Sequence, residues 1–274
     1  MFKKITFIIS IILSISFLNS CEFNTAKKIQ DPEKKYTKAA EYYNAGKYAK
    51  TQILLEDVIL SLRMTKSGED ALYKYADSYY HMKDYILAGY YFRKYTTDYP
   101  KGKHAEEAQF MSAKCYYLDA PKSTLDQQAT YTALKEFELF ITKYPDSKRI
   151  EDCNNLVDEL RARLEKKSYN NAKLYFDIGY YNAASIALKN SMKDYPDTKY
   201  KEDIIYLIAK SKYKYAQNSI ISKQKERYED AMNSLNEYTE KYPSGEYLKE
   251  LKSIKKNIKK ELSKLQKNQT ASIN

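Results

Sequence analysis

This chain of 274 residues has no tryptophan, only 6 glycines and 6 prolines, 3 cysteines and 2 histidines. With so few backbone breakers and no alternating strand pattern, the composition favours an all-helical fold. Neither His81 nor His104 has a cysteine or carboxylate partner at metal-ligand spacing, and the sequence lacks a glycine-rich phosphate loop and a G-x-S-x-G motif. These absences predict a protein that is not an enzyme and that has no catalytic residues, metal or cofactor.

The chain does contain an internal repeat, marked by four Tyr-Pro pairs. Each pair ends the same segment, in which an alanine is followed four residues later by a large apolar residue. A small residue lets two helices approach closely, the large one fills the gap, and the proline ends the helix. This is the pattern of the second helix of a tetratricopeptide (TPR) repeat. The four copies have Ala88 with Phe92, Ala133 with Phe137, Ala184 with Leu188, and Ala231 with Leu235, and an earlier copy without Tyr-Pro has Thr51 with Leu55.

First helices can be located by counting back from each second helix. Their small residues are Ala39, Ala76, Ala113, Ala172 and Ala209. Residues 118–125 and 218–225 are insertions, and the fourth first helix is lengthened to about 149–177. The sequence therefore predicts an all-α, right-handed superhelix (solenoid) of about five irregular TPR helix pairs with a C-terminal capping helix, over residues 32–266, and a disordered tail over 267–274.

An acidic pair follows the turn before each of four first helices. Acids in a first turn complement the partial positive charge of a helix N-terminus, whereas adjacent helical residues point in different directions and make a poor catalytic dyad. We therefore interpret them as helix caps. The pairs are Glu69-Asp70, Glu106-Glu107, Glu151-Asp152 and Glu202-Asp203.

The N-terminus has the organisation of an export signal. Lys3 and Lys4 precede a short apolar run, and a small residue stands directly before Cys21. We expect a lipoprotein signal peptide at 1–20, lipidation of Cys21, and a polar lipidated tether at 21–31. The alternative is an ordinary signal peptide with a coincidental cysteine. Glu22 after Cys21 favours the outer membrane over the inner one, by resemblance to known lipoproteins.

Two other features have structural interpretations. From Lys249 to Lys267 there are eight lysines against two glutamates, but apolar residues recur every three or four places in the same stretch. This indicates a capping helix with a solvated basic face, not a nucleic-acid site, and attraction to anionic lipid is a secondary possibility for that face. Cys115 and Cys153 fall at small-residue positions of first helices, which predicts two buried thiols and no disulfide.

Taken together, the lipobox, five unequally spaced repeats and long fourth first helix resemble the BamD family, the TPR lipoproteins of the outer-membrane β-barrel assembly machine (BAM complex). The segments 144–164 and 184–200 carry most of this resemblance. It implies a scaffold in the cell outer membrane, anchored by its lipid and facing the periplasm. Implied partners are unfolded outer-membrane proteins, the POTRA-containing barrel subunit and other assembly lipoproteins, with no nucleic acid.

The repeat register predicts where clients of such a scaffold would bind. Inward-facing positions of the first three first helices are rich in aromatic residues, which suit aromatic β-strand segments. We expect Tyr43, Tyr80 and Tyr117 to line one strip because they share a position in three repeats. The full candidate groove is Tyr36, Tyr43, Tyr73, Asp77, Tyr80, His81, Phe110, Lys114 and Tyr117.

Two rival functions share the TPR pattern. A periplasmic adaptor for envelope or cell-wall proteins would need the repeats but not the long fourth first helix. A nutrient-binding lipoprotein would use tryptophan to stack on sugar rings, and this chain has none.

Overall fold

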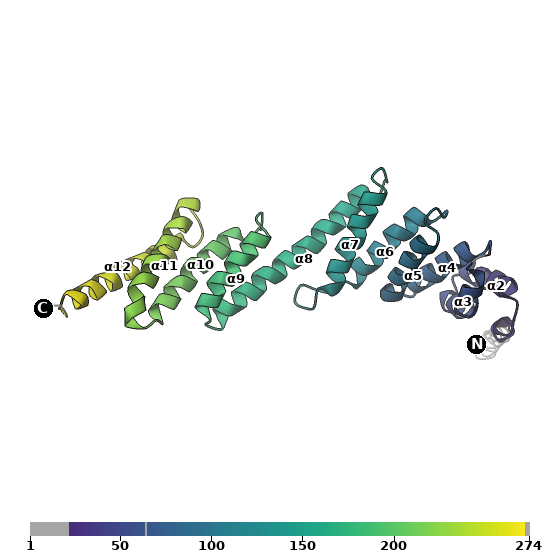
Figure 1. The fold of residues 1–274 in the computed structure, drawn as a ribbon, viewed down its shortest axis with the longest axis horizontal. Coiled ribbons are helices and arrows are strands. Elements are labelled where there is room, and N and C mark those ends of the chain that lie inside the picture. Colours follow the sequence, from purple (N-terminus) through teal and green to yellow (C-terminus); the bar gives the residue numbers. More distant parts are fainter. Residues whose placement is uncertain (1–21, 64, 272–274) are drawn as a thin grey trace, which may run out of the picture. The chain divides into compact units, whose positions relative to one another are not determined.

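A computed structural model describes residues 22–63 and 65–271, and within them every regular element is helical (Figure 1). The labelled helices are α2 (Pro32–Asn44), α3 (Tyr48–Leu62), α4 (Gly68–His81), α5 (Tyr85–Asp98), α6 (Ala105–Asp119), α7 (Gln128–Lys143), α8 (Ile150–Asp177), α9 (Tyr181–Asp194), α10 (Lys201–Gln217), α11 (Ile221–Lys241) and α12 (Leu248–Ala271). The predicted signal peptide and Cys21 lie outside the described residues.

These helices form the five predicted TPR pairs, from α2 with α3 to α10 with α11. The repeat alanines and their large partners are buried, with Ala88, Ala133 and Ala184 fully inaccessible. Each Tyr-Pro tyrosine caps its second helix with φ near −130°, a conformation that ends the helix before the proline. The prediction of an all-α TPR solenoid is confirmed.

The chain divides into two compact units, an N-terminal unit up to Leu160 and a C-terminal unit from Arg161. The N-terminal unit packs its core around residues such as Phe92 and Phe137. The core of the C-terminal unit is built around Leu188 and Ile204, and it is closed by Leu251, Ile254 and Ile258 of α12. The predicted capping helix is therefore α12. The boundary falls inside α8, so the long fourth first helix contributes to both units.

Successive repeats are joined by a carboxylate near the start of a first helix. Glu69 accepts hydrogen bonds from the Tyr95 hydroxyl and from the backbone N–H of Lys103, both at 2.6 Å. Glu202 does the same with the Tyr238 hydroxyl at 2.6 Å and the Glu246 N–H at 2.9 Å. We call each such set of contacts a joint. Because it links a helix to the turn before the next first helix, it ties neighbouring repeats together.

Other joints use a side-chain hydroxyl in that turn, as between repeats one and two, where the Ser67 hydroxyl donates to Glu33 at 2.6 Å. The Ser147 hydroxyl donates to Glu106 at 2.6 Å, and the Thr198 hydroxyl donates to Glu165 at 2.5 Å. The predicted acidic pairs do lie in first turns. However, Glu69, Glu106 and Glu202 bond the following repeat as well. In the fourth repeat this role belongs to Glu165, inside α8, and not to Glu151-Asp152.

Three predicted boundaries need correction. Residues 22–27 are helical, and Ala26 is buried, so this part of the expected tether packs on the first repeat. The expected insertion at 218–225 is largely helical, because α11 already begins at Ile221. The expected disordered tail is helical as far as Ala271, since nothing in the sequence after residue 266 breaks the helix.

Candidate protein-binding surface

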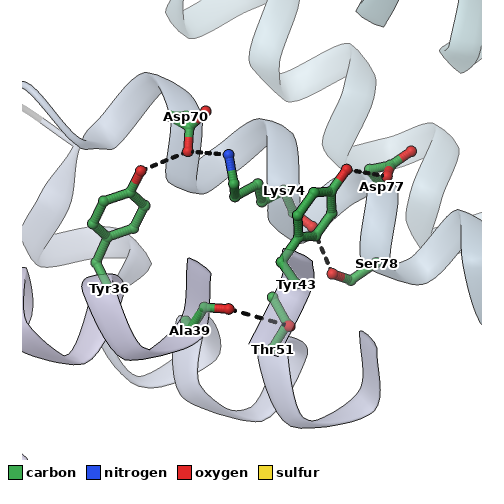
Figure 2. A network of polar contacts seen from close by, with 8 residues as sticks. All are labelled: Tyr36, Ala39, Tyr43, Thr51, Asp70, Lys74, Asp77 and Ser78. Carbon is green, nitrogen blue, oxygen red and sulfur yellow. Dashed lines mark hydrogen bonds and ion pairs between the residues drawn. The ribbon is translucent and has the colours of Figure 1, made fainter. Parts of the chain in front are cut away.

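Tyrosines on α2 donate hydrogen bonds to carboxylates on α4 (Figure 2). The Tyr36 hydroxyl lies 2.6 Å from Asp70 Oδ2, and the Tyr43 hydroxyl lies 2.5 Å from Asp77 Oδ2. Lys74 pairs with Asp70, and its ammonium lies 5.2 Å from the centre of the Tyr43 ring. The two phenols therefore bridge the first helices of repeats one and two, and their positions are held by charge-assisted hydrogen bonds.

The electrostatics favour a charged Asp70 and neutral phenols at Tyr36 and Tyr43. Burial raises the pKa of Tyr36 and Tyr43, and hydrogen bonds to Asp70 and Asp77 raise both further. Burial pushes the pKa of Asp70 upward, but hydrogen bonds from Lys74 and Tyr36 outweigh it and hold that pKa below its ordinary value. Asp70 is therefore a carboxylate at neutral pH, and both phenols remain donors.

An aromatic row continues from Tyr43 along the turns that connect the helices of repeats one and two. The Tyr43 and Tyr48 rings are 5.8 Å apart, and Tyr48 stacks on His81 at 4.1 Å. Next along the row, Tyr80 lies 5.8 Å from His81 and 5.9 Å from Tyr85. His81 is also 3.2 Å from Asp77, the acceptor of the Tyr43 hydroxyl. Tyr43 and Tyr80 are thus linked through shared neighbours.

The strip of Tyr43, Tyr80 and Tyr117 extends into repeat three, where the side chains that contact the tyrosines carry different charges. Lys114 occupies the position that corresponds to Asp77, and its ammonium lies 5.9 Å from the centres of the Tyr80 and Phe110 rings. Tyr80 therefore faces a cation where Tyr43 faces a carboxylate. The Tyr117 hydroxyl donates to Glu159 at 2.5 Å, which carries the strip to α8 within the N-terminal unit.

Most of the nine candidate groove residues are at least partly exposed, but two are not. Phe110 is 4% exposed and packs edge-on against Phe140, so it offers no surface to a client and leaves the candidate set. Asp77 is 8% exposed and orients Tyr43 and His81. Tyr73 stacks on His104 at 4.2 Å, and its ring also packs edge-on against Phe92 and Tyr95.

Sequence reasoning missed three residues of this surface. Tyr48 belongs to the aromatic row although it begins a second helix. Asp70 and Glu159 are the acceptors for Tyr36 and Tyr117. A signal for Asp70 was present, because Tyr36–Asp70 and Tyr43–Asp77 share a separation of 34 residues.

The described residues include two cysteines, and both lie in the core of the N-terminal unit. Cys115 and Cys153 are free and buried, and burial raises their pKa values to about 12 and about 11. In the described part of the chain, no three or more histidine, cysteine, aspartate or glutamate residues are grouped closely enough to hold a metal ion. Likewise, none of its helices has the length and apolarity needed to cross a bilayer.

The stacked helix pairs with an aromatic first-helix strip define a TPR repeat protein, a class whose repeats present extended binding surfaces. Comparison with known proteins identifies the family. The family model of YfiO, described as an outer membrane lipoprotein, matches residues 29–214, and the chain belongs to this family.

A relative named for outer-membrane protein assembly agrees with this assignment. The chain is 24% identical over 258 residues to the "Putative outer membrane protein assembly factor BamD" of Aquifex aeolicus (strain VF5), covering 91% of this chain and 81% of the relative. The resemblance to the BamD family is thereby confirmed. Among solved structures, the TPR domain of P58(IPK) aligns over 94% of this chain and 68% of its own, at 14% identity and a TM-score of 0.38.

Proposed function

We propose that this protein is a lipid-anchored scaffold of the outer-membrane β-barrel assembly machine. It binds unfolded outer-membrane proteins through its N-terminal repeats and the POTRA-bearing barrel subunit through its last two repeats. Membership of an outer membrane lipoprotein family and similarity to a protein named as an assembly factor support this role. The protein works by holding its partners in position and performs no chemistry itself.

The aromatic strip is the observation that carries client binding. Tyr43, Tyr80 and Tyr117 lie on three consecutive first helices, and their neighbours connect them. An extended client segment can lay apolar and aromatic side chains against such ring faces. Because the hydroxyls of Tyr43 and Tyr117 already bond to Asp77 and Glu159, these two rings bind mainly through their faces. The ring of Tyr80 adds contact beside the Lys114 cation.

Substitution of the strip tests client binding. Changing Tyr43, Tyr80 and Tyr117 to alanine should weaken binding of a peptide that ends in an aromatic β-strand signal by upwards of about 1 kcal/mol per anchor. The matched control changes the same three residues to phenylalanine, which keeps the rings and removes the hydroxyls. We expect this control to keep most of the affinity in a fluorescence titration. Equal affinity of the folded triple-alanine protein would place the client site elsewhere.

Affinity purification tests the assembly role against its rivals. The tagged lipoprotein from solubilised outer membranes should bring down a large POTRA-containing barrel protein. Recovery of a cell-wall hydrolase instead would support an envelope adaptor, and recovery of a carbohydrate transporter would support nutrient binding. The triple-alanine protein should still capture the POTRA protein, because that contact is assigned to the last two repeats.

Anchoring follows from Cys21, which we propose is lipidated so that the repeats face the periplasm. Cys21→Ala should give a folded protein that leaves the membrane fraction, because acyl chains contribute about 0.8 kcal/mol per buried CH₂ and dominate attachment. Fractionation in high salt without the barrel subunit is the appropriate measurement. Full membrane retention there would mean that lipidation is not the anchor.

A further inference from the structure

The positive charge of the described chain is concentrated in its C-terminal unit. Residues 22–160 carry 21 lysines and arginines against 22 aspartates and glutamates, so their charges nearly cancel. Residues 161–271 carry 24 against 14, and α12 alone contributes eight lysines and two glutamates to these counts. More than half of the excess charge of this unit therefore belongs to one helix.

Seven of these eight lysines lie on one face of α12. Successive residues of an α-helix are about 100° apart, so the seven fall within an arc of roughly 140°, opposite the side that packs on the core. The core side holds Leu251, Ile254 and Ile258, which are at most 7% exposed. All seven lysine side chains are exposed, and we call them the lysine stripe: Lys249, Lys252, Lys256, Lys259, Lys260, Lys264 and Lys267.

The other charged residues of α12 lie beside the lysine stripe. Lys255 is half-buried and donates to a side chain of α11 at 2.7 Å. Glu250 pairs with Lys210 of α10 at 2.9 Å. Glu261 pairs with Lys264 of the stripe at 2.7 Å. One glutamate cannot balance seven lysines, so the stripe keeps a large excess of positive charge.

The lysine stripe has more charge of one sign than a capping helix requires. A cap needs only a polar outer face, which side chains of mixed charge would also provide. Within the stripe, six pairs of lysines are three or four residues apart, the spacing at which helical side chains are neighbours. Like charges at this spacing destabilise a helix, and an anionic partner would remove that repulsion. The stripe is therefore better explained as a binding surface than as a solvated cap.

The form of the lysine stripe favours a flat partner. It runs along one side of a single helix for about 27 Å, at about 1.5 Å per residue, so a plane can touch its whole length. The apolar side of α12 is already buried in the core, so the helix cannot bury that side in a bilayer as an interfacial helix does. Contact with a membrane would be electrostatic. Because the chain belongs to an outer membrane lipoprotein family, a lipid surface lies within its reach.

We propose that the lysine stripe of α12 binds the anionic phospholipid headgroups of the membrane surface. Each lysine near such a surface adds to the attraction, and salt screens it. The contact attaches the C-terminal unit to the membrane by itself and does not depend on lipidation of Cys21. The competing occupant is an acidic segment of a partner protein, which is a less regular surface than a bilayer.

Vesicle binding measures this contact on the chain from residue 21 onward, with Cys21→Ala so that no lipid is attached. The chain should sediment with vesicles of phosphatidylcholine and phosphatidylglycerol, and much less with phosphatidylcholine alone. Changing Lys252, Lys256 and Lys260 to glutamine should weaken binding to the anionic vesicles roughly a hundredfold, at about 1 kcal/mol per lysine. This variant should melt no lower than the parent, because it relieves like-charge repulsion and alters no core residue.

The matched control removes the same formal charge from the same unit but outside α12. It changes three exposed lysines of α9 and α11 to glutamine: Lys189, Lys193 and Lys225. We expect this variant to bind anionic vesicles nearly as well as the parent. Equal losses in the two triple variants would mean that vesicles respond to net charge and not to the stripe, and would overturn the proposal.

A fluorescent label tests which side of the unit meets the bilayer. The label is placed at Ser253→Cys, an exposed position inside the arc of the stripe, or at Asn190→Cys, an exposed position on α9. Cys115 and Cys153 are buried and should not compete for it. On anionic vesicles whose headgroups carry a quencher, the label at residue 253 should be quenched more strongly. Equal quenching at the two positions would contradict the contact.

The parent chain also separates the two occupants. If phosphatidylglycerol does not raise its binding to vesicles, the membrane contact is rejected. If it then binds poly-glutamate, and the variant with glutamine at residues 252, 256 and 260 does not, the stripe serves an acidic protein segment instead. Neither outcome affects the proposed function, which assigns no contact to α12.

Discussion

Two joints use the same kind of carboxylate but different hydrogen-bond donors. One joint lies between repeats two and three, and the other lies between repeats four and five. In the N-terminal unit, Glu69 receives the phenol of Tyr95 from the second helix, and the adjacent turn residue is Gly102. In the C-terminal unit, Glu165 receives the hydroxyl of Thr198 from the turn itself. The residue corresponding to Tyr95 there is Ser191, which bonds Ser168 instead.

Each of these joints has a hydroxyl donor, and the donor comes either from the second helix or from the turn. A Cβ atom at Gly102 would lie 2.6 Å from the Tyr95 hydroxyl and 2.8 Å from Glu69 Oε1, so a phenol donor excludes a side chain in the turn. The joint between repeat five and α12 agrees, because it combines Tyr238 with Gly245, where a Cβ would lie 2.5 Å from Glu202 Oε1. A turn with a side chain, as at Thr198, carries its own hydroxyl.

The largest expected effect on stability comes from removing the carboxylate that accepts both hydrogen bonds of a joint. Glu69→Ala should lower the free energy of unfolding by about 3 kcal/mol, since two donors lose a charged partner and each such bond contributes about 1.5 kcal/mol or more. Glu202→Ala should cost a similar amount in the C-terminal unit. Denaturant unfolding gives the size, and hydrogen exchange should show the loss of protection within the unit that carries the change. A loss spread equally over both units would contradict independent joints.

Adding a side chain at Gly102 should lower the stability by less than removing Glu69 does. Gly102→Ser is expected to destabilise by about 1–3 kcal/mol, the usual range for overpacking, because the new Cβ must displace the Tyr95 hydroxyl. Gly102 does not have a positive φ, so the cost is steric and not conformational. Thermal unfolding measures it. Gly46→Ser at an open turn is the control for adding the same side chain where nothing lies within 4 Å, although its φ of 70° adds backbone strain.

A double substitution should convert one type of joint into the other. Tyr95→Phe with Gly102→Ser reproduces the combination of Phe140 with Ser147 at the next joint, where the serine hydroxyl donates to Glu106. The two changes together should therefore cost at least about 1 kcal/mol less than the sum of the single changes, within the usual coupling of contacting residues. A double-mutant cycle of unfolding free energies tests this. Strict additivity would mean that the hydroxyl does not transfer.

The smallest effect concerns thiol reactivity, which reports on the N-terminal unit because residues 161–271 contain no cysteine. Burial raises the pKa of Cys115 to about 12 and of Cys153 to about 11, so both thiols stay protonated at neutral pH. Because only the thiolate reacts, alkylation should be slow and intact mass should show two free thiols. Glu69→Ala should accelerate alkylation of Cys115, and Glu202→Ala should not. A mass lower by two hydrogens would instead reveal a disulfide.

The helix pairs could be predicted because Tyr-Pro and glycine mark their ends and the alanines mark their crossings. The start of α11 at Ile221 could not, since no breaker separates the insertion from the helix. The sequence predicts residues 22–27 as part of a polar tether because their apolar residues, Phe23 and Ala26, are too few to form a helical pattern. Their burial depends on Tyr42 and Lys50, which are distant in sequence.

The candidate surface was predicted only in part, for a related reason. Counting within the repeat placed Tyr43, Tyr80 and Tyr117 on one strip, but it did not distinguish a partly exposed ring from one buried in the core, such as that of Phe110. Contacts between repeats determine that distinction. Glu165 was missed because α8 has no break to mark where its repeat register begins. Counting seven residues back from Ala172 would have found it.

The joints also explain how repeats of unequal length coexist in one array. Their donors and acceptors are 34 residues apart for Glu69 and Lys103, 41 for Glu106 and Ser147, 33 for Glu165 and Thr198, and 44 for Glu202 and Glu246. The contact is the same although the intervening chain varies, so extra residues are accommodated in the loop at 120–127 or in the longer α11. The array therefore accommodates inserted residues between its joints. The loop at 120–127 is a suitable site for grafting a foreign peptide, because an insertion there leaves the register of the neighbouring repeats unchanged.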